Sequence, residues 1–198
     1  MARRKDHTRK ELKGLILEQA QKIIFSKGLE KLTARNLAQA IGYAPGTIYN
    51  VFRDLDTIIL SVNLQTLIQL EEACRKNLSA NDKSEKAAWI LAHSYVDFAQ
   101  AHRQAWSALF SYQYPANRKL PDWYTQQVER LFQLIADTVQ ENYGLSKEQS
   151  NLSARVLWGS LHGLCSLTVH GKLESLTGIS LQDQVDFLLG RFFTSAKN

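Results

Sequence analysis

The 198-residue sequence is poor in the residue types that stabilise disulfide-rich, zinc-bound and β-rich proteins. It contains two cysteines, Cys74 and Cys165, together with three prolines and ten glycines. Two cysteines without CxxC or other metal-like spacing argue against a disulfide framework and against a zinc finger. The scarcity of glycine and proline argues against a sandwich or barrel with many tight turns.

Long hydrophobic runs are also missing from the sequence. The longest uncharged stretch, residues 156–171, has 16 residues and includes glycines, serines and histidines. It is therefore too short and too polar to span a bilayer. The chain starts MARRKDHTRKELKG, which contains no apolar core of a secretory signal. We expect a soluble, cytoplasmic protein without a membrane partner.

Positive charge is concentrated in the first third of the chain. Residues 1–60 hold 11 basic and 6 acidic side chains, whereas the remaining residues hold 13 of each, so the whole net charge of +5 lies in residues 1–60. This asymmetry favours a polyanion as the partner of the N-terminal segment, with nucleic acid ahead of an acidic membrane surface. The alternative is an incidental, solvated basic tail.

Apolar residues recur at spacings of three and four along most of the chain, which indicates amphipathic helices, and no convincing strand alternation occurs. We expect an all-α fold of about nine helices, over residues 10–27, 34–41, 45–52, 56–78, 84–101, 102–110, 122–143, 146–170 and 181–194. Thr33, Asp56 and Ser180 are suited to cap helices, and Ser146 with Gln149 forms a capping box.

Residues 33–52, TARNLAQAIGYAPGTIYNVF, contain two short predicted helices separated by a tight turn. This is the pattern of a helix-turn-helix, whose second helix enters the major groove of DNA. Ala38 is small enough for close helix approach, Gly42 permits the turn, and Ile48 points to the core. The predicted DNA-binding residues are Thr33, Arg35, Tyr43, Ala44, Pro45, Gly46, Thr47, Tyr49 and Asn50. The predicted phosphate contacts are Arg3, Arg4, Lys5, Arg9, Lys10 and Arg35.

The segment from Ile16 to Ile59 resembles the TetR family of bacterial transcription regulators. The matching residues are Gly28, Thr33, Leu37, Ala38, Gly42, Gly46, Thr47, Ile48, Tyr49 and Phe52. The resemblance implies a three-helix DNA-binding domain at residues 1–56 and a helical domain for ligand binding and dimerisation at residues 57–198.

Two positions depart from the family pattern. The turn holds Tyr43-Ala44 where a small aliphatic residue and serine are common, so the second helix loses a capping hydroxyl and a phenol is available to the DNA. Val51 stands where an aromatic residue or histidine is frequent, so a backbone contact could be missing. Both departures leave the operator sequence open.

A second pattern lies in the C-terminal part of the chain. Trp158, His162 and Gly163 share one predicted helix, similar to a TetR-type C-terminal domain named for its Trp, His and Gly. Gly159 and Gly163 permit close helix contact, within the chain or across a dimer, and the resemblance favours the dimer. The predicted dimer residues are Val156, Gly159, His162, Gly163, Ser166, Phe187, Leu188, Arg191 and Phe192.

The same resemblance implies a small-molecule effector bound between helices. The lack of net charge after residue 60 favours an apolar or aromatic effector. The predicted effector-binding residues, which alternatively are ordinary core, are Trp89, His93, Tyr95, Phe98, Trp106, Phe110, Trp123, Tyr124 and His162.

The resulting expectation is a homodimeric DNA-binding regulator, a repressor of a near-palindromic operator, released by an unknown effector and without enzymatic activity, cofactor or metal. One alternative is an architectural DNA-binding protein with no effector. A weaker one is an enzyme or metal protein, for which His162 with Cys165 and His93 with Asp97 could each supply two ligands. No nucleophile motif supports catalysis.

Overall fold

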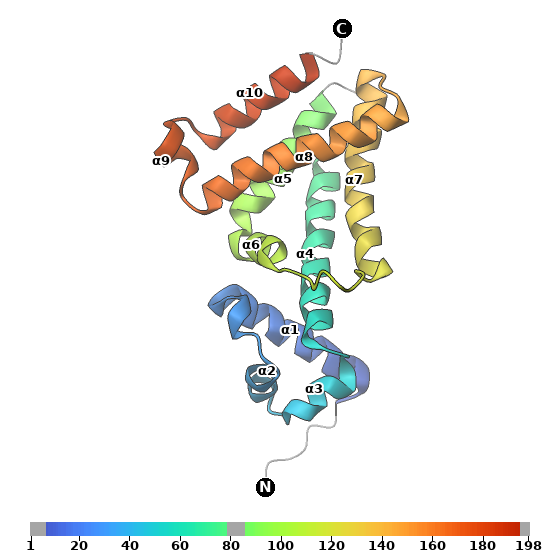
Figure 1. Cartoon of the computed structure of the whole chain (residues 1–198), viewed down its shortest axis with the longest axis vertical. Helices are drawn as coiled ribbons and strands as arrows, with labels where there is room; N and C mark the ends of the chain where they lie inside the picture. Colours follow the sequence, from blue (N-terminus) through green and yellow to red (C-terminus); the bar gives the residue numbers. More distant parts are fainter. Residues whose placement is uncertain (1–6, 79–85, 195–198) are drawn as a thin grey trace. The chain divides into compact units, whose positions relative to one another are not determined.

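The computed structural model describes residues 7–78 and 86–194, and these residues form helices and loops without any strand. The helices, shown in Figure 1, are α1 (Arg9–Lys27), the 3-10 turn η1 (Leu29–Lys31), α2 (Ala34–Ile41), α3 (Pro45–Val51), α4 (Leu55–Asn77), α5 (Lys86–Ala101), α6 (Arg103–Ser111), α7 (Asp122–Tyr143), α8 (Lys147–Val169), α9 (Leu173–Thr177) and α10 (Leu181–Thr194). The expected all-α fold is confirmed.

The chain divides into two compact units. The first unit comprises Met1–Thr66 and Gln104–Leu120, and the second comprises Leu67–Arg103 and Pro121–Asn198. Helix α4 therefore begins in the first unit and ends in the second. The two units are compact pieces of the fold, and they are not the same stretches as the functional regions expected at residues 1–56 and 57–198.

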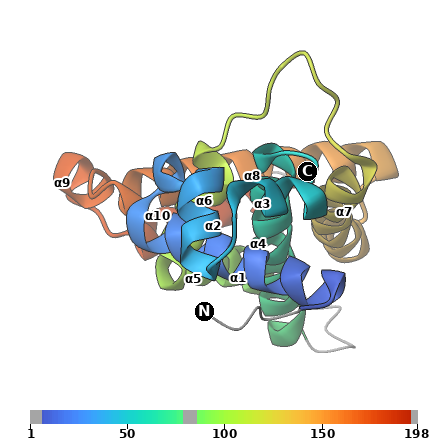
Figure 2. The ribbon, with the colours of Figure 1, turned by 90° about the horizontal axis from the view of Figure 1, so that it is seen from below.

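The core of the first unit is built from α1, α2, α3 and the start of α4. Ile16, Leu37, Ile48 and Ile58 each have no exposed surface and belong to one apolar cluster. Ala108 of α6 joins the same cluster, so a helix far along the chain completes this core. Figure 2 shows α2 and α3 beside each other, as their contacts require.

In the second unit, α8 packs against α7, α5 and α10. Its buried face carries Ala154, Leu157, Leu161 and Cys165 at helical spacing. Helix α10 lies alongside α8 in Figure 1 and buries Val185 and Leu189, among others. The capping box of Ser146 and Gln149 begins α8, as the sequence predicts.

The structure differs from the sequence-based expectation at the start of α4. The Asp54 carboxylate, rather than that of Asp56, accepts the backbone N–H of Thr57 at 2.8 Å and caps the helix. Both acids lie near the helix start, and the extended backbone at Phe52 places Asp54 at the cap.

The structure also adds the short helix α9, whose five residues are too few to show periodicity. The expected helix start at residue 84 lies outside the described residues.

Gly42 ends α2 with a φ of +75°, a left-handed conformation that is costly for a residue with a Cβ. We expect Gly42→Ala to lower the free energy of unfolding by roughly 1–2 kcal/mol for this reason alone, since a Cβ there meets nothing within 4 Å. The matched control is Gly14→Ala in α1, where a Cβ also meets nothing and helix propensity should add up to about 1 kcal/mol. Urea denaturation measures both changes, and equal effects of the two variants would contradict the assignment of the turn.

Candidate nucleic-acid interface

The helix-turn-helix is set by caps at the start of α2 and α3. The Thr33 hydroxyl accepts the backbone N–H of Asn36 at 3.0 Å, and the Asn36 side chain donates to the carbonyl of Lys31 at 2.9 Å. Helix α3 begins at Pro45, whose missing N–H costs nothing in a first turn. The residue before it, Ala44, gives no side-chain cap, as its departure from the family pattern predicts.

Helix α3 has one anchored face and one open face. Within α3, all of whose residues are described, Ile48 is the buried side chain. Thr47 is half-buried, and Tyr49 is 52% exposed. The other predicted contacts that are exposed on or beside α3 are Ala44, Pro45, Gly46 and Asn50. The structure therefore brings most of the predicted DNA-binding residues onto one accessible surface.

Tyr43 lies differently from the other predicted contacts. Its side chain is half-buried, and its hydroxyl shares a hydrogen bond of 2.7 Å with Nδ1 of His7, just before α1. The two rings are 6.1 Å apart. The phenol thus ties the start of α1 to the turn of the helix-turn-helix. No sequence pattern predicts this pair, because 36 residues separate its members.

Basic side chains surround this surface. Arg9 and Lys10 at the start of α1 and Arg35 in the first turn of α2 are exposed, as is Thr33. The predicted phosphate contacts Arg3, Arg4 and Lys5 lie outside the described residues. Exposed cations beside a helix N-terminus are suited to hold phosphate, because the backbone N–H groups there also point toward an anion.

The predicted effector-binding residues are distributed over both units. Trp106 and Phe110 belong to the first unit, with ring centres 5.0 Å apart, and the other seven belong to the second. Tyr95, Phe98, Trp106 and Tyr124 are buried, whereas Trp123 is exposed. Half-buried are Trp89, His93, Phe110 and His162. The structure thus groups these residues in pairs and small clusters.

One such cluster joins α5 to α8. The hydroxyl of Tyr95 and Nδ1 of His162 are 3.1 Å apart, and the Trp158 ring stacks on the imidazole at 5.3 Å. Burial lowers the pKa of His162 from its ordinary value of 6.5. The imidazole therefore favours its neutral form, which can donate one hydrogen bond and accept another.

His93, two residues before Tyr95 in α5, contacts α10 and lines a groove. His93 contacts Asp186 of α10 at 2.9 Å rather than pairing with Asp97 as a metal site would require. The groove is open, measures about 730 Å³ and is lined by Asn77, Lys86, Trp89, Ile90, His93, Ser94 and Asp97. Across residues 7–78 and 86–194, no group of three His, Cys, Asp or Glu side chains could hold a metal ion.

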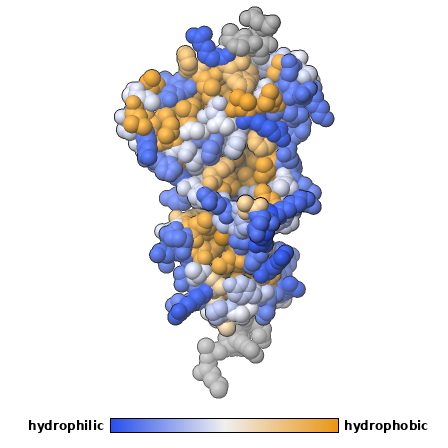
Figure 3. All heavy atoms as spheres, viewed as in Figure 1, coloured by the Kyte–Doolittle hydropathy of each residue, from blue (hydrophilic) through white to orange (hydrophobic). Residues whose placement is uncertain are grey.

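The predicted dimer residues lie on α8 and α10. Val156 is 49% exposed and Phe187 is 68% exposed, and Gly159, Gly163 and Arg191 are also exposed. Ser166, Leu188 and Phe192 are half-buried. Beside them, an open groove of about 570 Å³ runs between the two helices, lined by Ser160, Leu164, Ile179, Asp183, Gln184, Phe187 and Leu188. Figure 3 shows apolar surface over this part of the view.

Comparison with protein families identifies both parts of the chain. The family model described as tetracyclin repressor-like, C-terminal domain, matches residues 90–192, which include Trp158, His162 and Gly163. The model described as bacterial regulatory proteins, tetR family, matches residues 16–62. The chain belongs to the TetR family. This TetR-family protein is therefore a DNA-binding transcriptional regulator, and not an enzyme.

Solved structures show the same fold. The TetR-family chain is similar to a protein of unknown function from Rhodococcus sp. RHA1, with 19% identity, 98% of each chain covered and a TM-score of 0.76. A TetR family transcription regulator from Shewanella sp. PV-4 is 17% identical, over 96% of this chain and 98% of that chain, with a TM-score of 0.67. The multidrug binding protein EbrR complexed with imidazole is 16% identical, over 95% and 96%, with a TM-score of 0.67. No curated protein sequence matches the chain.

Among the helices of this regulator in residues 7–78 and 86–194, none is both long enough and apolar enough to cross a bilayer.

The lowered pKa of His162 predicts a pH dependence of stability. As the pH falls below 6.5, the unfolded chain takes up the proton before the folded chain does, so the free energy of unfolding decreases. We expect His162→Gln to be less stable than the wild type at about pH 8 and to lose part of this disadvantage at about pH 5. The control Tyr95→Phe keeps the imidazole, so its free energy of unfolding should decrease on acidification as that of the wild type does. Parallel pH profiles of the wild type and His162→Gln in urea denaturation would contradict the prediction.

Proposed function

We propose that the protein binds a near-palindromic operator as a homodimer, with the exposed face of α3 in the major groove. The observation that carries this proposal is the arrangement of α3, in which Ile48 is fully buried while Tyr49 and Asn50 are exposed. A helix that presents polar and aromatic side chains beyond its anchored face is what base-edge recognition requires. In this proposal residues 1–56 carry DNA binding.

Phosphate contacts position the helix on the duplex. The exposed Arg9, Lys10, Thr33 and Arg35 border the helix-turn-helix, and the concentration of positive charge in residues 1–60 adds long-range attraction. Each phosphate neutralised releases counterions, so affinity should fall with salt. We assign Arg3, Arg4 and Lys5 the same role on the basis of the sequence.

The dimer forms, in this proposal, through α8 and α10. Leu152, Val156 and Leu167 leave an exposed apolar row on α8, and Phe187 is exposed on α10. Gly159 and Gly163 lie on the same helix, and a Cβ at either meets nothing within 4 Å in the chain itself. We infer that these two glycines allow a second copy to approach closely, because they lie between the exposed apolar residues of α8, whereas the equally open Gly14 lies on α1. A stable interface of this kind buries on the order of 2,000 Å² or more.

The regulatory response is assigned to residues 57–198. Regulators of the TetR family typically have small-molecule effectors, and the similar protein EbrR is complexed with imidazole. We propose that this protein is a repressor, acting in the cytoplasm and released by a small apolar or aromatic effector. Support comes from the aromatic content of α5–α8 and from the neutral His162–Tyr95 pair as a polar anchor. An effector acts only if it binds the two states of the protein with different affinity.

DNA recognition by α3 predicts the effect of shortening its exposed side chains. Tyr49→Ala and Asn50→Ala should each weaken operator binding about tenfold, because a lost base contact costs roughly 1–3 kcal/mol. Fluorescence anisotropy with a labelled operator measures the change. The control Leu176→Ala removes a side chain that is 75% exposed on α9 and should leave affinity unchanged. If both α3 variants bind the operator with wild-type affinity, another surface of the protein reads the operator.

The dimer proposal predicts a monomeric variant. Gly163→Leu adds a side chain that its own chain accommodates, since nothing lies within 4 Å of a Cβ there, but that would separate two closely packed copies of α8. We expect light scattering to give the mass of one chain and operator affinity to drop. Gly14→Leu, equally open on α1, should remain dimeric. A dimeric Gly163→Leu at micromolar concentration would rule out this interface.

A further inference from the structure

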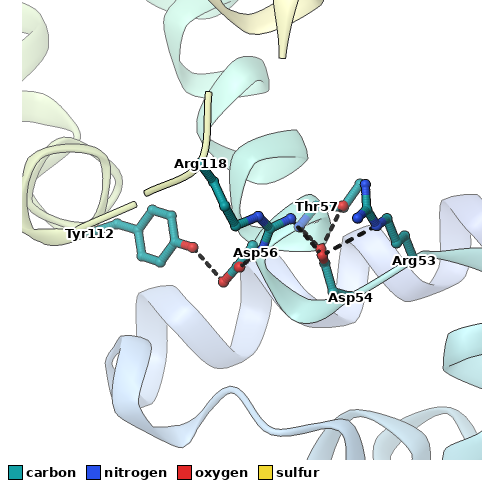
Figure 4. Close-up of polar contacts among 6 residues, drawn as sticks. All are labelled: Arg53, Asp54, Asp56, Thr57, Tyr112 and Arg118. Atoms are coloured by element: carbon teal, nitrogen blue, oxygen red, sulfur yellow. Dashed lines mark hydrogen bonds and ion pairs between the residues drawn. The ribbon is translucent and has the colours of Figure 1, made fainter. Parts of the chain in front are cut away.

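The junction between α3 and α4 is stabilised by side chains rather than by continuous helix. The chain is extended at Phe52, where α3 ends, so no backbone helix hydrogen bonds fix the direction of α4. Asp54 then caps α4 by accepting the backbone N–H and the hydroxyl of Thr57, at 2.8 and 2.6 Å. Figure 4 shows this cap among the polar contacts around it.

A cation from the loop between α6 and α7 bridges both acids of this junction. Nη2 of Arg118 donates to Asp54 at 2.8 Å, and Nη1 donates to Asp56 at 2.5 Å (Figure 4). The hydroxyl of Tyr112 donates to the other oxygen of Asp56 at 2.6 Å. The ring of Tyr114 lies 5.3 Å from the guanidinium. One loop thus supplies three side chains to the junction.

The charges at the junction are stabilised in their ionised forms. Burial opposes ionisation of Asp54, but hydrogen bonds from Thr57 and Arg118 outweigh it and lower the pKa of the carboxyl. The hydrogen bond to Asp54 raises the pKa of Arg118. The three side chains are about a third exposed or less. A forked, charge-assisted contact of this kind fixes geometry as well as supplying energy.

The loop that carries Arg118 belongs to a segment of the first unit that lies, in sequence, between two stretches of the second unit. Residues Gln104–Leu120 belong to the first unit, while Arg103 before them and Pro121 after them belong to the second. The chain therefore passes between the units at both ends of this segment, in addition to its passage within α4.

We propose that Arg118 is a positioning residue for operator binding. By bridging Asp54 and Asp56 it fixes the direction in which α4 leaves α3, and thereby the placement of two recognition helices on one operator. The inference rests on the proposed recognition by α3. It also assigns Arg118 a second effect, since its charge offsets two carboxylates at the junction with the DNA-binding helices, where uncompensated negative charge would repel phosphate.

The test compares two DNA probes, an operator duplex selected by the wild-type protein and a duplex with one of its half-sites. A residue that positions two recognition helices should affect the full operator far more than the half-site, to which one helix binds. We expect Arg118→Ala to weaken binding to the full operator about tenfold. Half-site binding should change by no more than about twofold. Arg118→Lys, which keeps the charge but not the fork, should show part of the defect.

The matched control is Lys119→Ala, which removes one positive charge from the neighbouring, exposed position of the same loop. It should affect both probes equally and slightly. Tyr112→Phe removes a single hydroxyl, and it keeps the test available if Arg118→Ala does not fold. We expect it to lower the ratio of full-operator to half-site affinity in the same direction as Arg118→Lys.

Three results would overturn the inference. Arg118→Ala could bind the full operator like the wild type, or it could lose affinity for both probes in equal proportion, which would show that Arg118 acts through its charge or on folding and not by positioning the helices. The inference would also be wrong if Arg118→Lys and Tyr112→Phe left the ratio of full-operator to half-site affinity at its wild-type value. If instead the wild type selects no DNA, the proposed recognition by α3 fails and the role of Arg118 fails with it, a result distinct from the others.

Discussion

A helix of seven residues keeps a defined face accessible only if its other face is packed, and in this protein Ile48 lies at the centre of the packed face. Ile48 reaches the apolar cluster formed by Ile16, Leu37 and Ile58, none of which has exposed surface. Because successive residues of a helix point about 100° apart, burying Ile48 turns Tyr49 outward. The accessible face of α3 is therefore a consequence of its packed face, to which Val51 also contributes, and the caps act on a helix that this packing has already oriented.

The packing of Ile48 and Val51 fixes the rotation of α3 better than it fixes the direction of the chain after this helix. The extended backbone at Phe52 leaves the direction of α4 to side chains, and the Asp54 cap supplies the local part of the constraint. We infer that Arg118 supplies a distant part, in addition to the packing of Ile58 and Val62 of α4 in the apolar cluster. The core of the first unit also combines residues that are near and distant in sequence, because Ala108 of α6 completes a cluster of buried residues otherwise built from α1–α4. The DNA-binding helices thus depend on residues near position 110 of the chain.

The sequence predicted those features that are set by neighbouring residues. The caps at Thr33 and Ser146 and the turn at Gly42 depend on contacts three or four positions away, and the structure contains all of them. The prediction of Asp56 as the cap of α4 was wrong, because Asp54 lies two positions earlier and its carboxylate accepts the backbone N–H of Thr57. The bridge of Arg118 was not predictable either, because more than 60 residues separate it from its partners and no periodicity marks it.

In the C-terminal region, too, contacts between residues that are distant in sequence were not predictable. Aromatic content predicts that large side chains will meet, but not which of them, and the structure buries Tyr95 while it leaves Trp123 exposed. Tyr95 and His162 come together across 67 residues through the packing of α5 on α8. Trp106 belongs to the other unit, although composition alone groups it with the rest. The predicted effector-binding and dimer residues accordingly remain proposals, whereas the family and the fold do not.

Recognition of one operator by α3 of two copies can be tested by selecting DNA from a random pool with the purified full-length protein and sequencing it. We expect a near-palindromic site whose half-sites are centred roughly 34–36 Å apart, or a multiple of that distance. Failure to enrich any sequence, or enrichment of a site without two-fold symmetry, would contradict it.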